Sequence, residues 1–329
     1  MDDVRAFLDA FEAFFRHLAA VSLGTLALAL AFHVLRLTLR VRAWQNILRA
    51  SYPEARAPFR RVFGAYVAGI GVNAITPARA GDLVKLYLAK RRVDGSSYPT
   101  LGSTLVVETL FDFVVGLALF LWALERGLLP ALPRLPGLGA FDWSFFAEHP
   151  RLAAMLASVL VGGAILLLAW ASTRVADFRA NVRRGFTILG DRRTFATKVV
   201  SWQAGSWAAR AASVAFFLEA FHIQATVETV LAVLVVQGLA TMLPFTPGGA
   251  GTQQAVLVFA LAGTAQATAV LSFSVGMQLA TVAVNVALGF GAIAVMMRTL
   301  RWRSRVLAPE EGLARGKPGA ARSRSALRG

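Results

Sequence analysis

Charged side chains that interrupt apolar sequence are the residues of this chain whose types and spacing could do chemistry. Glu108 and Asp112 are four residues apart and share a helix face, so two carboxylates point at one space, where an arginine can neutralise them or one can stay protonated. We expect Arg79 and Arg210 to be the cations that hold a phosphate bidentately. Such charges either line a ligand pathway or pair to fix helix register, and for Arg79, Asp82 and Glu108 we favour the pathway.

Two turns rich in glycine and proline resemble each other. Residues 76–82 read TPARAGD and residues 246–252 read TPGGAGT, so both contain T-P-x-x-A-G. Each turn leads into a helical run, so its free backbone N–H groups and positive helix end favour an anion. Gly248, Gly249 and Gly251 leave room for a ligand to approach the backbone, or they only permit close helix packing.

The motifs of common soluble enzymes are absent from the sequence. There is no G-x-S-x-G, no H-E-x-x-H and no Walker A motif, and the four histidines are isolated from one another. Without cysteine there is no thiolate metal site and no redox couple. We therefore expect neither an enzyme nor a cofactor.

The elements that must position these residues are membrane helices. Hydrophobic residues make up 57% of the 329 residues and charged residues only 16%, which is too apolar for an ordinary soluble domain. Apolar stretches approach or exceed the roughly 20 residues of a spanning helix at 19–35, 101–124, 152–171, 199–221, 227–243 and 267–297. The sequence thus predicts an all-α integral membrane protein. We place Arg36 near a helix end, where its side chain would reach the interface.

The formal charge of +16 raises the alternative of a nucleic-acid partner, which the placement of the charges excludes. Most Lys and Arg lie between the apolar runs, at 40–61, 85–92, 174–198 and in the tail from 298. This pattern is typical of cytoplasmic loops of a multi-pass bacterial inner-membrane protein. It predicts an N-terminus outside the cytoplasm and a C-terminus inside it.

Two segments differ from ordinary spans and define the expected architecture. Residues 62–76 are too short to span and return to a basic stretch, and residues 228–245 are followed by the second turn, so we expect two re-entrant helical hairpins. Their opposite orientations predict an inverted repeat with about five full spans. We divide the chain into an interfacial amphipathic helix at 1–17, which could instead pack on the protein itself, a transmembrane domain at 18–300 and a disordered basic cytoplasmic tail at 301–329.

The sequence resembles the flippase-like transmembrane family that includes the membrane region of lysylphosphatidylglycerol synthases. The resemblance covers roughly residues 10–300 and rests on Asn73-x-x-x-Pro77-x-Arg79-x-Gly81-Asp82, on Glu108 and Asp112, and on residues 244–252. It implies an inner-membrane protein that binds or flips lipids. The part after Arg301 is too short for the synthase domain, so we expect a stand-alone member without synthase activity. Many members show a Glu where this chain has Gln253 and Gln254.

Together these observations predict a transporter of an anionic or head-group-modified lipid, which could be a phospholipid, a glycolipid or an isoprenoid lipid. The alternatives are an accessory subunit that binds a lipid-synthesis enzyme, and a membrane-embedded enzyme acting on a lipid phosphate with Glu108 and Asp112 as acid and base. The expected substrate-binding residues are Asn73, Pro77, Arg79, Gly81, Asp82, Glu108, Asp112, Arg210, Pro247, Gly248, Gly249, Gly251 and Thr252. No catalytic residue and no metal ligand are expected.

Overall fold

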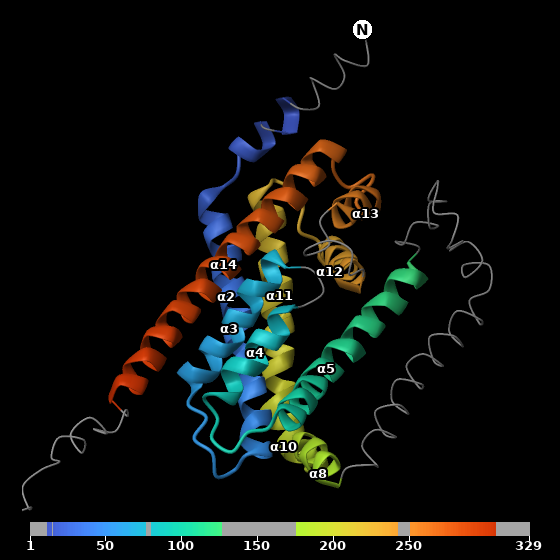
Figure 1. The fold of residues 1–329 in the computed structure, drawn as a ribbon. Helices are drawn as coiled ribbons and strands as arrows, with labels where there is room; N and C mark the ends of the chain where they lie inside the picture. The colour runs from blue at the N-terminus through green and yellow to red at the C-terminus, as the bar shows by residue number, and fades with distance from the viewer. Residues whose placement is uncertain (1–11, 15, 77–79, 127–175, 243–250, 307–329) are drawn as a thin grey trace, which may run out of the picture.

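The computed structural model describes residues 12–14, 16–76, 80–126, 176–242 and 251–306, and every regular element in this part is a helix (Figure 1). The elements are α2 (Leu23–Ser51), α3 (Phe59–Ile75), α4 (Ala80–Lys90), α5 (Tyr98–Glu125), α8 (Ala176–Gly185), α9 (Thr187–Gly190), α10 (Arg192–Phe195), the π-helical turn η1 (Ala196–Val200), α11 (Ser201–Ala220), α12 (Val227–Met242), α13 (Thr252–Ala260) and α14 (Ala267–Val306). The all-α expectation is therefore confirmed for the described residues.

Helices α2 and α11 form an antiparallel pair that is tied together along its length. The Ser213 hydroxyl donates to the Ala29 carbonyl (2.8 Å), and the Ser206 hydroxyl donates to the Arg36 carbonyl (3.1 Å). Near the other end, the Asn46 amide donates to the Lys198 carbonyl (2.6 Å). Small polar side chains of this kind hold helices together where lipid offers no hydrophobic driving force.

Helix α2 continues well beyond the apolar stretch that ends at residue 35. It runs over 29 residues to Ser51, which corresponds to about 43 Å. Arg36 consequently lies near the middle of the helix, and the placement of Arg36 near a helix end was wrong. The sequence of α2 becomes less apolar after residue 35 because this part of the helix packs against other helices, and not because the helix ends at the membrane interface.

Helices α3 and α4 pack against each other on either side of residues 77–79. Asn73 near the end of α3 accepts a hydrogen bond from the Gly81 N–H (2.7 Å), and its amide contacts the Asp82 carboxylate (3.3 Å). A side-chain methyl at Gly81 would lie 1.9 Å from the Gly69 carbonyl oxygen. Gly81 therefore permits the close approach of the two helices. That this pair enters and leaves the membrane on one side stays a prediction.

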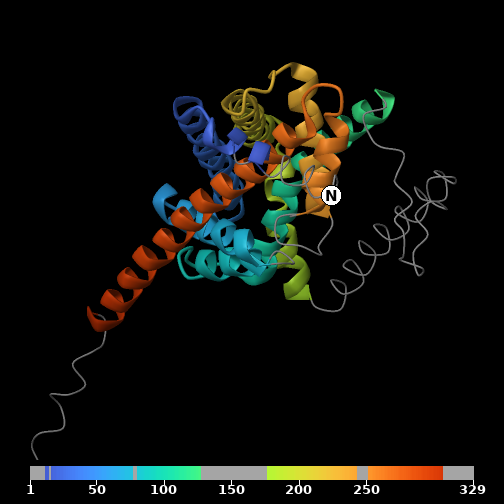
Figure 2. The same cartoon turned by 90° about the horizontal axis from the view of Figure 1, so that it is seen from above.

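Helix α14 crosses α3 at a contact between two glycines, and its C-terminal end extends away from the bundle in both views (Figures 1 and 2). A methyl group placed on Gly289 would lie 2.6 Å from the Gly71 Cα. Helix backbones come this close only where side chains are absent.

Two apolar clusters occupy opposite ends of the α2–α11 pair. The first gathers buried side chains of α2 from Val41 to Leu48 with those of α3, α4 and the start of α5. The second gathers Ala29 with the later part of α11, with α12 and α13, and with the first turns of α14. The stretch of α2 between Ala29 and Val41 separates them, and this stretch carries His33, Arg36 and Arg40. The fold thus places a polar layer between two apolar clusters.

Three helices in the described part are long and apolar enough to cross a membrane: α2, α5 and the Ala267–Met296 portion of α14. The stretch Val227–Leu239 of α12 is apolar but shorter, and the expected span at 152–171 lies outside the described residues. The count of five spans and the inverted repeat stay predictions. Residues 12–19 are mostly helical, and Ser272 of α14 donates a hydrogen bond to the Phe14 carbonyl, so this segment contacts the protein itself.

Candidate functional site

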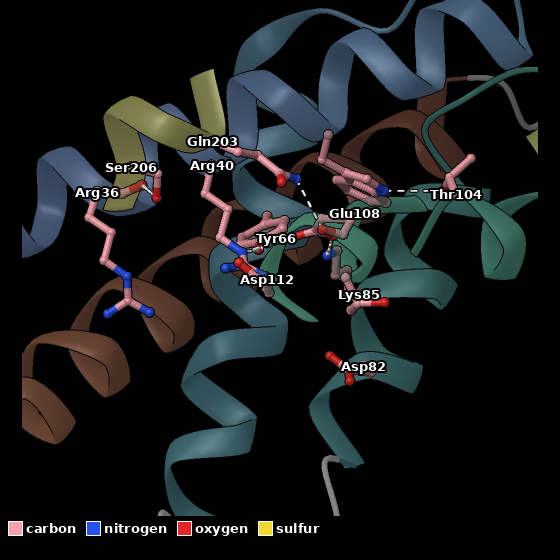
Figure 3. A network of polar contacts seen from close by, with 12 residues as sticks. Arg36, Arg40, Tyr66, Asp82, Lys85, Thr104, Glu108, Asp112, Gln203 and Ser206 are labelled. Atoms are coloured by element: carbon pink, nitrogen blue, oxygen red, sulfur yellow. Dashed lines mark hydrogen bonds and ion pairs between the residues drawn. The ribbon is translucent and has the colours of Figure 1, made fainter. Parts of the chain in front are cut away.

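Glu108 on α5 is the centre of a network of buried charges in the polar layer (Figure 3). Its side chain is 3% exposed, and both carboxylate oxygens have donors. Lys85 of α4 donates to Oε2 at 2.7 Å, while Arg40 of α2 donates to Oε1 at 2.9 Å. The Tyr66 hydroxyl of α3 also donates to Oε1. Four helices are therefore joined through one carboxylate.

Arg40 extends the network to a second carboxylate. Its Nη2 donates to Asp112, which lies one turn after Glu108 on α5. Asp112 also accepts a hydrogen bond from the Trp207 indole of α11 at 2.9 Å. The prediction that an arginine neutralises the two carboxylates is thus supported, but the arginine is Arg40, which we had counted among the cytoplasmic charges.

Aromatic and amide groups hold the charged side chains in place. The Lys85 ammonium lies 3.7 Å from the Tyr66 ring centroid and 4.3 Å from that of Trp44, which suits a cation over aromatic faces. The Trp44 indole donates to the Thr104 hydroxyl at 3.1 Å, and the Gln203 amide donates to the Glu108 carbonyl at 3.0 Å. The geometry of the network is therefore fixed by its surroundings.

The network balances its own charge. Arg40 and Lys85 carry two positive charges, and Glu108 and Asp112 carry two negative ones, so each buried ion has an opposite partner. Buried ions persist only when they are paired and hydrogen-bonded in this way. The quartet consequently offers no unpaired charge to a ligand.

Two further arginines of the polar layer have no such partner. Neither Arg36 nor Arg210 forms an ion pair with another residue in the described part of the chain. Arg210 donates to the Gln237 amide oxygen of α12 at 3.0 Å and lies 4.9 Å from the Trp207 ring centroid. Its Nε is buried and finds no acceptor among the described residues. In Figure 3 no dashed line joins the Arg36 guanidinium to the quartet.

A neutral polar pair completes this layer. The His33 ring, one helical turn before Arg36, contacts the Asn285 amide oxygen of α14 at 2.9 Å. His33 is 5% exposed. Among the described residues, the layer therefore holds a balanced quartet beside two arginines that form no ion pair.

Apart from Gly251 and Thr252, the expected site residues fall into three groups in the structure. Glu108 and Asp112 come together in the quartet, and Arg210 lies in the same layer on α11. Asn73, Gly81 and Asp82 join α3 to α4, and Figure 3 shows Asp82 away from the quartet. Residues Pro77, Arg79, Pro247, Gly248 and Gly249 lie outside the described residues. Their expected roles stay predictions.

The start of α13 shows how the second turn is organised. Gly251 has a φ of 88°, a left-handed conformation that favours glycine, and Thr252 begins the helix after it. The Gln254 amide oxygen accepts a hydrogen bond from the Gly251 N–H at 2.6 Å, and its amide nitrogen donates to Gln278 of α14. The neutral Gln254 thus caps the helix at a place in the chain where many members of the resembling family show a Glu.

Sequence reasoning missed four members of the network: Arg40, Tyr66, Lys85 and Trp207. Arg40 follows His33 and Arg36 at helical spacing on α2, and this periodicity was the one signal that could have placed it inside the bundle. Lys85 follows Asp82 by one turn on α4 but gives no comparable signal. Glu108 pairs with Arg40, 68 residues earlier in the chain, and with Lys85, 23 residues earlier. Pairs this far apart in the sequence are set by tertiary packing alone.

Comparison with protein families gives a match over most of the chain. The family described as the transmembrane region of lysylphosphatidylglycerol synthase matches residues 6–289, which include every described helix that contributes to the network. Comparison with curated proteins gave no match. A membrane assignment agrees with the three long apolar helices and with the polar layer enclosed between apolar clusters. The chain is thus a membrane protein and belongs to the lysylphosphatidylglycerol synthase transmembrane-region family.

Proposed function

We propose that this protein binds an anionic or head-group-modified lipid in the bacterial inner membrane and moves it between leaflets, without being an enzyme. The observation that carries the proposal is the pair Arg36 and Arg210, which have no carboxylate partner in the described structure. An uncompensated arginine at membrane depth is costly, so such residues mark a ligand or ion pathway. The planar guanidinium is also suited to holding phosphate oxygens bidentately.

The surroundings of the two arginines suit a ligand that arrives from lipid. Arg210 has an open donor in its buried Nε, and Gln237 beside it offers an amide. The carboxylates of the neighbouring quartet form their ion pairs with Arg40 and Lys85, and none with Arg36 or Arg210 in the described structure. An anionic head group would supply the missing counter-charge while its acyl chains stay in the membrane.

Movement of the lipid needs a second arrangement of the helices. We propose that the α3–α4 pair is a re-entrant hairpin and that the second half of the chain repeats it in inverted orientation, so that the halves rock about the polar layer. Lys85 would then exchange its partner, because it lies on α4 one turn after Asp82 and now pairs with Glu108. Such an exchange gives the two states different contacts, as a population shift requires.

The enzyme alternative fits the site less well. Glu108 accepts hydrogen bonds from three side chains, and Asp112 accepts from two, so neither carboxylate is poised to take a proton from a substrate. Among the described residues no cluster of metal ligands lies nearby. The accessory-subunit alternative has no observation in its favour and is an outcome of the experiment below.

The test is lipid movement by the purified protein in liposomes that contain a fluorescent phosphatidylglycerol, read out by quenching from the outer side. We expect Arg36→Gln and Arg210→Gln each to slow the movement by about ten-fold or more, which corresponds to about 1.4 kcal/mol. Each variant removes charge-assisted hydrogen bonds to the head group.

The matched control is Arg184→Gln, because Arg184 is exposed on α8, outside the polar layer. Unchanged movement in both polar-layer variants would refute the assignment of the site. No movement by the wild-type protein, together with stable capture of a lipid-synthesis enzyme, would favour the accessory subunit.

A further inference from the structure

A cavity distinct from the polar layer lies where α2 ends and α3 begins. It has a volume of about 360 Å³ and is lined by Arg49, Ala55, Arg56, Ala57, Pro58 and Arg61. This volume lies in the range of small-molecule pockets. Three of its six lining residues are arginines, so its chemistry is that of an anion site.

The cavity has a wall that is fixed from inside the protein. The Ala57 carbonyl accepts a hydrogen bond from the Gln45 amide at 2.7 Å, and Gln45 is completely buried. Tyr52, which ends α2, is buried, and its hydroxyl accepts from the Ser97 N–H at 3.1 Å. The segment between α2 and α3 is therefore anchored on both sides. A fixed wall keeps the arginines around one space rather than leaving them on a flexible loop.

The arginines of the cavity have no counterions in the described structure. None of Arg49, Arg56 and Arg61 forms an ion pair there, and Glu54, the nearest acid in the sequence, is exposed and pairs with none of them. The cavity is open to solvent: Arg49 and Arg56 are exposed and Arg61 is half-buried, so an anion that enters it can contact three arginines that have no ion-pair partner among the described residues. The first turn of α3, whose N-terminus follows Pro58, adds its positive end to the same space.

We propose that this cavity binds a phosphate group, and that the phosphate belongs to the head group of a membrane lipid. The planar guanidinium group of arginine donates two parallel hydrogen bonds that match the oxygens of a phosphate. Three arginines carry three positive charges, which suits a phosphate dianion or a phosphodiester that has a further acceptor group. The cavity lies at the end of α2, a helix that is long and apolar enough to cross a membrane, so a lipid phosphate can reach it while the acyl chains stay in the bilayer. This site is separate from Arg36 and Arg210 and does not depend on their role.

The experiment uses native mass spectrometry of the full-length protein taken from nanodiscs of phosphatidylglycerol and phosphatidylcholine. The variant Arg49→Gln/Arg56→Gln/Arg61→Gln is compared with the wild type and with Arg60→Gln, an exposed arginine on α3 that does not line the cavity. We expect the triple variant to retain one phosphatidylglycerol fewer, and Arg60→Gln to retain as many as the wild type. Restoration of the lipid by Arg→Lys at the three positions would show that charge rather than packing is responsible.

A second arm distinguishes the source of the phosphate. Inorganic phosphate is added at millimolar concentration before measurement, with chloride at equal ionic strength as control. One lipid is expected to be retained by the wild type and lost in the triple variant. If inorganic phosphate does not displace this lipid from the wild type, the head group and its acyl chains bind together, as we propose. Displacement by phosphate, or binding of phosphate instead of lipid, would overturn the lipid source and leave a free anion site.

A third result would refute the site altogether: equal lipid retention and no phosphate binding in the wild type and the triple variant. An unchanged melting temperature of the triple variant shows that it is folded. The variant Arg36→Gln/Arg210→Gln is measured in parallel, so that loss of a lipid at the polar layer is seen separately. The cavity can therefore fail while the proposed function stands, and the reverse also holds.

Discussion

At the scale of single residues, the quartet around Glu108 illustrates how a membrane protein keeps charges away from lipid. The Glu108 side chain, which pairs with the buried Lys85, is 3% exposed, whereas the Asp112 side chain is 25% exposed. Removing one partner of a buried ion pair leaves the other unpaired, which costs about 3–5 kcal/mol. The burial of each carboxylate therefore ranks the cost of losing it.

This ranking gives a prediction for Glu108→Gln and Asp112→Asn. We expect Glu108→Gln to lower the thermal unfolding temperature in detergent clearly more than Asp112→Asn, because only the first leaves Lys85 without a carboxylate. Static light scattering or tryptophan fluorescence during heating measures the unfolding temperatures of both variants.

A second variant separates charge from packing. Because Met replaces the Lys85 ammonium by an apolar group of similar length, Glu108→Gln combined with Lys85→Met should be more stable than Glu108→Gln alone. If the two losses simply add, Lys85 and Glu108 are not energetically coupled, and the pairing at 2.7 Å contributes little.

At the scale of elements, helices in lipid associate through close packing at their crossings, because the hydrophobic effect does not drive helices together there. Helices α3 and α14 approach through Gly71 and Gly289, and α3 and α4 approach through Gly69 and Gly81. The backbone of α3 is thus in contact with two other helices. Any side chain at these crossings must push the helices apart.

We therefore expect Gly289→Ala to lower the thermal unfolding temperature, since its new methyl group would lie 2.6 Å from the Gly71 Cα. Gly116→Ala on α5 is the matched control, because nothing lies within 4 Å of a methyl group there. In a helix interior that control should be neutral or stabilising by up to about 1 kcal/mol. Equal stability of the two variants would contradict a tight α3–α14 crossing.

At the scale of the whole molecule, basic segments that are far apart in the sequence meet at one end. Tyr52 after α2 contacts Ser97 before α5, and the Thr100 hydroxyl at the start of α5 donates to the Asn181 carbonyl of α8 at 2.7 Å. Arg92 donates to the Met296 carbonyl of α14 at 2.8 Å. The opposite end carries the turn after α11, where the Ser22 N–H donates to the Ala220 carbonyl. The described basic segments after α2, after α4 and around α8 therefore lie at the same end of the molecule.

This asymmetry predicts the orientation in the membrane. The chain has no cysteine, so single cysteines at exposed positions can be labelled without background. We expect a membrane-impermeant maleimide to label Gln224→Cys in intact spheroplasts, and to label Arg193→Cys only after the membrane is opened. Labelling of Arg193→Cys in intact spheroplasts would place the basic end outside and reverse the proposed topology.

The sequence by itself determined that the protein lies in lipid and that its membrane segments are helices. Long apolar runs require helices in lipid, because only a helix satisfies its own backbone groups there, and the structure and the family match agree with this. It also placed Glu108 and Asp112 on one helix face, since helical spacing is a local property, and left open whether a cation neutralises them or one of them is protonated.

Only the tertiary structure decided which cations they receive. The sequence named no particular arginine as their partner, whereas in the structure Arg40 and Lys85 bind the carboxylates, and both lie in segments that we expect from the sequence to be cytoplasmic. The extent of α2 beyond residue 35 brings Arg40 into the bundle, and the packing of α4 on α3 brings Lys85 beside Tyr66. A basic residue at the end of an apolar run looks the same in the sequence whether it reaches water or a buried carboxylate, because the partner lies on another helix whose position packing alone sets.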